Sequence, residues 1–116
     1  MDYYDINNID FKPYDRYGKD SIVAGLSWKN LHYDEKTYCG TYLLRFDKDT
    51  QSKYHEHMDY EEFLILRGTL YDSHSNRVHS AGTYVKMYPG TRHYSYSSEG
   101  CLVFVISHGN FIFPKL

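Results

Sequence analysis

Short runs of apolar and aromatic residues, separated by polar or glycine-containing turns, make up most of this sequence. TYCGTYLLRF at 37–46 and the continuous apolar run CLVFVIS at 101–107 have the length and composition of strands, and no segment combines helix caps with a 3.6-residue period. Runs at 22–28, 61–71 and 82–90 predict further strands, with 61–71 interpreted as strand, turn and strand. Many short strands with glycine-rich turns indicate an all-β sandwich or barrel.

The N-terminal segment has a different pattern. Residues 1–20 are polar with interspersed aromatic residues, and Pro13 disfavours a regular element there. We therefore predict an extended arm over 1–20, followed by a single β-barrel domain over 21–116. A length of 116 residues fits one compact domain, and no linker-like segment divides the chain.

The composition supports β structure and excludes some partners. Aromatic residues make up 18% of the chain, including 14 tyrosines, and such rings favour strands and can line a pocket. The formal net charge is -2 and no run of lysine or arginine occurs, so no electrostatic footprint predicts binding to nucleic acid or to an anionic membrane.

The beginning of the chain and its cysteines suggest a compartment. The stretch MDYYDINNIDFKPYD is acidic and has no apolar core, which is unlike a secretory signal, so we expect a cytoplasmic protein. Cys39 and Cys101 are too few for a disulfide framework and are predicted to be reduced, buried thiols. A single disulfide between them is left open.

Histidines and glutamates cluster around the stretch KYHEHMDYEE. His55 and His57 are two residues apart, so they project to the same side of a strand, and Glu61 shares their parity. His93 follows the tight turn PGT and can reach the same point from another strand. Imidazole and carboxylate ligands suit one divalent transition metal, such as iron(II), manganese, nickel, copper or zinc.

These residues also lie in motifs that resemble a known family. HEHMDYEEFLILRG at 55–68 resembles the first cupin motif, in which His-x-His is followed after three or four residues by Glu and after six more by Gly. GTYVKMYPGTRH at 82–93 resembles the second motif, although Tyr88 stands where proline is usual and Pro89 follows it. The likeness extends over roughly 24–107 and is strongest to the ChrR-like branch of the cupins.

The resemblance implies a fold and a ligand set. Cupins have a double-stranded β-helix, or jelly-roll barrel, and the motifs would make His55, His57, Glu61 and His93 the metal ligands. A four-residue gap, also known in cupins, would select Glu62 instead, whereas strand parity favours Glu61. The acetylacetone-cleaving enzymes of the ChrR-like branch use three histidines without the carboxylate, so Glu61 is a departure from their pattern.

The same resemblance implies two functions. The first is a metal-dependent oxygenase, a dioxygenase acting on a small organic molecule such as a diketone or an enolisable acid. The second is a metal-binding sensor of the anti-sigma-factor type. We expect a small-molecule partner and a homodimer, because cupins commonly dimerise through their sheets.

Several other residues have a less specific pattern. His74 and His79 lie in a predicted hairpin loop, and His32 and His108 flank predicted strands, so none is expected to bind metal. Arg45 and Arg67 lie inside apolar strands and would either anchor an acidic group or face solvent. The candidates for the mouth of the barrel are Tyr42, Tyr84, Met87 and Tyr96. The tail FIFPKL at 111–116 is expected to pack on the barrel or on a second subunit.

Overall fold

The computed structural model describes residues 1–114, and its regular secondary structure is almost entirely β-strand, as predicted. The strands are β1 (Lys12–Pro13), β2 (Leu26–Asp34), β3 (Cys39–Phe46), β4 (Thr50–Gln51), β5 (His55–His57), β6 (Glu61–Asp72), β7 (Arg77–Ser80), β8 (Tyr84–Met87), β9 (Arg92–His93), β10 (Ser95–Ser97), β11 (Cys101–His108) and β12 (Phe111–Ile112), with one short 3-10 helix, η1 (Lys19–Ser21). No helix within the described residues is long and apolar enough to cross a membrane.

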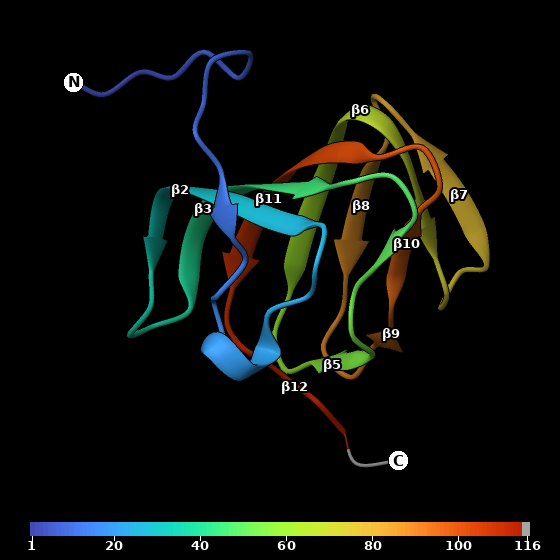
Figure 1. Cartoon of the computed structure of the whole chain (residues 1–116). Coiled ribbons are helices and arrows are strands. Elements are labelled where there is room, and N and C mark those ends of the chain that lie inside the picture. Colours follow the sequence, from blue (N-terminus) through green and yellow to red (C-terminus); the bar gives the residue numbers. More distant parts are fainter. Residues whose placement is uncertain (115–116) are drawn as a thin grey trace.

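The strands form two antiparallel sheets. The larger has the order β1-β2-β3-β11-β6-β10-β4, with β7 and β8 also paired to β6, and the smaller has the order β12-β5-β9. The sheets curve around a common interior, and β5, β9 and β12 lie together at one end (Figure 1). The chain begins at the opposite end, runs down across β2 and reaches the small-sheet end at η1, while the C-terminal segment leaves from that same end (Figure 1).

The hydrophobic core is formed by inward-facing side chains of the larger sheet. β11 is hydrogen-bonded to β3 on one side and to β6 on the other, which explains its continuous apolar sequence. Tyr42, Ile65, Val103 and Val105 are each at most 1% exposed. The prediction of a core strand at 101–107 is therefore confirmed, and burial of these side chains supplies much of the stability of the barrel.

The strand β6 differs from the prediction of strand, turn and strand, because it runs unbroken from Glu61 to Asp72. Its register against β11 shifts between Ile65 and Arg67, so Leu66 is the extra, bulged residue, and Gly68 two residues later has φ 74°. The bulge reverses the alternation: Glu61 and Ile65 are buried before it, whereas Leu70 and Asp72 are buried after it. It therefore turns Asp72 toward the interior.

Three other expectations need correction. β2 begins at Leu26 and continues to Asp34, beyond the predicted 22–28, and β1 includes Pro13 within the predicted arm. Proline is tolerated there because β1 is an edge strand. Both cysteines are free, but Cys39 is exposed, and Cys101 pairs with the opposite end of β3, so the two cannot bridge.

Gly68, next to the bulge, supports a stability prediction. A Cβ at this position would lie 2.0 Å from the carbonyl oxygen of Gly100, while a Cβ at Gly82, where φ is also positive, would meet nothing. We expect Gly68→Ala to lower the free energy of unfolding by about 3 kcal/mol and Gly82→Ala by about 1 kcal/mol, because only the first adds a clash with the backbone to the φ strain. Equal losses in urea denaturation would contradict this account of the bulge.

Candidate metal centre

Three histidines are brought together by the small sheet. His55 and His57 lie on β5, and His93 on β9 is directly opposite His55. All three side chains are buried. The intervening residues Glu56 and Arg92 face the other way and form a 2.5 Å ion pair, so the period-2 alternation of paired strands explains why the histidines share one side.

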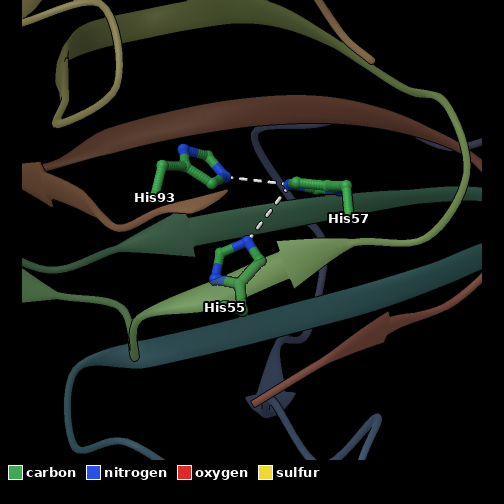
Figure 2. Close-up of side chains that lie close together, drawn as sticks. All are labelled: His55, His57 and His93. Atoms are coloured by element: carbon green, nitrogen blue, oxygen red, sulfur yellow. Dashed lines mark hydrogen bonds between the residues drawn. The ribbon is translucent and has the colours of Figure 1, made fainter. Parts of the chain in front are cut away.

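The Nε2 atoms of the three rings converge. The Nε2 of His57 is 3.2 Å from that of His55 and 2.8 Å from that of His93. Figure 2 shows the rings pointing to a common centre from the two strands. They form the one group of three or more potential ligands that lie close together within the described residues.

The Nδ1 atoms of His55 and His93 are held by hydrogen-bond acceptors. His55 Nδ1 donates to the carbonyl of Lys53 at 2.7 Å, and His93 Nδ1 donates to Asp72 Oδ1 at 2.6 Å. The other carboxylate oxygen of Asp72 accepts from the backbone N–H of Ser75 at 2.7 Å. Since a carbonyl and an ionised carboxylate can only accept, these bonds assign the proton to Nδ1 and leave both Nε2 atoms as bare lone pairs.

Glu61 lies beside the histidines but outside their common centre. Its Oε2 is 3.3 Å from His57 Nδ1, in a direction too poor for a good hydrogen bond. Its Oε1 accepts from the hydroxyl of Tyr42 at 3.2 Å and lies 3.6 Å from a terminal nitrogen of Arg16. Glu62 faces the outer surface, where it contacts His108 and Tyr84 at 2.5 Å each.

The donor set fits a divalent metal. Two nitrogen ligands at right angles, each about 2.1 Å from one ion, lie roughly 3.0 Å apart. The observed 2.8 and 3.2 Å separations bracket this value. Without a cation the converging lone pairs repel, and His57 can donate to at most one neighbour. The three histidines are thus positioned to bind one metal ion, and they leave other ligand positions open.

Burial and neighbouring charges shift the acid–base behaviour of the site. Burial lowers the pKa of His55 to about 3, and the nearby His93 acts in the same direction. Burial raises the pKa of Glu61, but the contact with His57 and the charge of Arg16 outweigh it and leave the pKa below its usual value. Burial also raises the pKa of Asp72, but the hydrogen bonds that it accepts from His93 and Ser75 outweigh burial and hold the pKa well below its usual value. The carboxylates therefore stay ionised.

A cavity of about 60 Å³ adjoins the histidines. His55, His93 and Glu61 contribute to its lining, and the rest is mostly aromatic and aliphatic. Both chain ends take part, since the N-terminal segment supplies Tyr17 and the C-terminal segment supplies Phe111. The centroids of these two tilted rings lie 4.0 Å apart, and the centroid of Phe111 lies 4.4 Å from that of His55. The site is thus an apolar pocket with imidazoles in its wall.

The remaining predicted residues have mixed outcomes. Tyr42 lines the cavity, Met87 is buried away from its lining, and Tyr84 and Tyr96 are surface residues. Arg45 and Arg67 face outward, where they contact Asp47 and Asn7. The other histidines, His32, His74, His79 and His108, are not part of the cluster. The tail packs on its own barrel through Phe111, and residues 115–116 fall outside the described part of the chain.

The sequence pattern did not identify two functional residues. For Asp72, alternation counted from Glu61 places the side chain on the outer face of the strand unless the bulge is known. Arg16 lies in the predicted arm, yet its side chain is fully buried against the site. No sequence signal marks Arg16 beyond its position between Tyr14 and Tyr17.

The comparison with protein families decides the classification. The profile of the ChrR cupin-like domain matches residues 7–111, a range that includes all three histidines, Asp72 and Arg16. The chain belongs to this family. A search of curated proteins found no match.

Solved structures confirm the cupin jelly-roll fold of this ChrR cupin-like domain. A candidate acetylacetone dioxygenase from Methylibium petroleiphilum PM1 superposes with a TM-score of 0.81 at 18% identity, over 99% of this chain and 81% of that one. An acetylacetone dioxygenase from Acinetobacter johnsonii gives 0.80 at 16%, over 99% and 78%. The anti-sigma factor ChrR of Rhodobacter sphaeroides, in complex with SigE, gives 0.69 at 14%, over 89% and 51%. At these identities the likeness establishes the fold alone.

Asp72 provides a prediction for the metal centre. In Asp72→Asn the side chain keeps its size but loses the charge that orients the His93 ring, so we expect metal affinity to fall by about 10- to 100-fold. Titration against a competing chelator measures the change. Glu62→Gln, on the outer face, is the matched control and should bind metal as the unmodified protein does; equal loss in both variants would contradict the role given to Asp72.

Proposed function

We propose that this ChrR cupin-like protein is a mononuclear metal-dependent oxygenase that acts on a small organic molecule, such as a diketone or an enolisable acid. The observation that carries the proposal is the convergence of three histidine Nε2 atoms beside an apolar cavity. Three protein ligands leave neighbouring positions open for a chelating substrate and a second small molecule.

The residues of this chain have definable roles in such a reaction. His55, His57 and His93 would hold the ion, and a bound iron(II), manganese or nickel would supply Lewis-acid and redox chemistry at its open positions. Lys53 O and Asp72 fix the orientation of two of the rings. The aromatic lining excludes water and favours an apolar substrate body, which a small diketone would offer.

The relatives support the same class of reaction. Two of the similar structures are described as acetylacetone dioxygenases, one of them as a candidate, and they cover nearly the whole of this chain. Their substrate is a property of those proteins. Its extension to this chain rests on the common fold together with the three-histidine cluster and apolar cavity present here.

Oxygen consumption tests the proposal. The metal-free protein is reconstituted separately with iron(II), manganese and nickel, and oxygen uptake is measured with a panel of diketones and enolisable acids. We expect uptake with iron(II) and at least one panel member, and none in His57→Ala. A protein that binds all three metals but consumes no oxygen with any substrate would overturn the catalytic proposal.

A metal-binding sensor of the anti-sigma type is the second candidate, favoured by the match to the ChrR profile and to the ChrR–SigE structure. An oxygenase needs an open metal position, whereas a sensor does not. Nitric oxide added to the iron(II)-loaded protein should give the electron paramagnetic resonance signal of an iron nitrosyl if a position is open. No signal from fully loaded protein would favour the sensor. The expected homodimer is a separate prediction, tested by mass in solution.

A further inference from the structure

Arg16 is the most heavily bonded buried side chain near the site. Its Nε donates to the hydroxyl of Tyr33 at 2.7 Å, and its terminal nitrogens donate to the hydroxyls of Tyr42 and Ser107 and to the carbonyl of Gly109 at 2.8–2.9 Å. These partners belong to β2, β3, β11 and the segment before β12. One residue of the N-terminal segment thus links the large sheet with the C-terminal segment.

The charge of Arg16 is balanced by Glu61. A buried guanidinium is costly unless a carboxylate compensates it, and the ion pair found for Arg16 in the described part of the chain is with Glu61 Oε1 at 3.6 Å. The side chains of Arg16 and Glu61 are 0% and 5% exposed. Tyr42 joins the pair, because it accepts from Arg16 and donates to Glu61.

Both oxygens of Glu61 point away from the common centre of the Nε2 atoms. Oε1 faces Arg16 and Tyr42, while Oε2 lies on the Nδ1 side of His57, the side of the ring away from the common centre of the Nε2 atoms. Yet Glu61 occupies the motif position that the sequence assigned to a ligand. Arg16 is therefore placed to determine whether the Glu61 carboxylate turns toward the metal centre.

We propose that Arg16 is a positioning residue that holds Glu61 behind His57 and off the metal, so that the centre has three histidine ligands and one more open position than a four-ligand site. Without the positive charge of Arg16, Glu61 is free to turn toward the ion and become a fourth ligand. The inference rests on the proposed metal site, and it adds a reason why a carboxylate at the motif position does not coordinate.

Cobalt(II) and azide provide the test, with coordination rather than catalysis as the readout. The visible spectrum of the cobalt-loaded protein reports ligand number, and azide titration reports an open position. We expect Arg16→Met to change the spectrum and to weaken azide binding about tenfold or more, because the freed carboxylate competes for the position. Arg16→Lys keeps the charge and should stay close to the unmodified protein. Arg45→Met removes an outward-facing arginine and is the matched control.

Glu61 variants decide whether the effect passes through the carboxylate. Glu61→Gln alone should leave the cobalt spectrum unchanged, and Arg16→Met combined with Glu61→Gln should restore it. A changed spectrum in Glu61→Gln would overturn the inference, because Glu61 would then already be a ligand, and this result stands even if Arg16→Met does not fold. An unchanged spectrum in a folded Arg16→Met would overturn it as well. Failure of the unmodified protein to bind cobalt would instead remove the metal site and with it both proposals.

Discussion

His93→Ala is expected to lose metal binding while keeping the fold. Removal of one of three imidazoles leaves two ligands, so affinity should fall by more than the roughly hundredfold that loss of a supporting hydrogen bond can cause. The barrel should survive, because His93 lies on a two-residue strand beside a cavity, outside the core formed by β3, β6 and β11. Metal content by elemental analysis and circular dichroism on the same sample measure both effects.

His79→Ala is the matched control, since His79 lies on β7 and is not part of the cluster. It should retain metal at the level of the unmodified protein. Full metal content in His93→Ala would contradict the proposed site, and so would equal loss in the two variants.

Phe111→Ala is expected to have the largest effect on stability. Phe111 is 8% exposed. Its ring centroid lies 4.0 Å from that of Tyr17, 4.4 Å from that of His55 and 5.1 Å from the guanidinium carbon of Arg16. Truncation removes this contact surface and enlarges the cavity, so the free energy of unfolding should fall by about 3–5 kcal/mol. Urea denaturation of the metal-free protein measures the change without a contribution from metal binding.

Phe113→Ala is the comparison for this prediction. The same side chain is removed two residues later, but Phe113 is 42% exposed, so the loss should be about 1 kcal/mol. If both substitutions cost the same, the C-terminal segment does not close the barrel through Phe111 as the structure indicates.

The all-β fold and the three histidines could be predicted because both depend on local alternation and spacing. His55 and His57 share a parity that any strand would preserve, and His93 follows the turn PGT in a stretch that resembles the second cupin motif. The core strand at 101–107 was recognisable for a similar reason, since a strand paired on both sides is apolar throughout.

The residues around the histidines could not be predicted because they depend on departures from alternation. The bulge near Gly68 reverses the parity of β6, so the inward position of Asp72 follows from the register and not from the local pattern. The same bulge accounts for the incorrect interpretation of 61–71 as two strands, because glycine in a strand resembles a turn signal.

Arg16 was missed for a different reason. Its partners are 17–93 residues away along the chain, and its own segment has no periodicity that predicts burial. A guanidinium is normally exposed, and only the tertiary arrangement of tyrosine hydroxyls and Glu61 compensates it here. Arg45 and Arg67, the arginines that the pattern did single out, face outward.

X-ray diffraction recorded at the absorption edge of the bound metal tests the central claim most directly. We expect one anomalous peak per chain, about 2.0–2.2 Å from the Nε2 atoms of His55, His57 and His93, as is usual for imidazole ligands. A peak bonded to fewer than three of these nitrogens, or a peak elsewhere in a fully loaded crystal, would contradict the metal centre on which the proposed function depends.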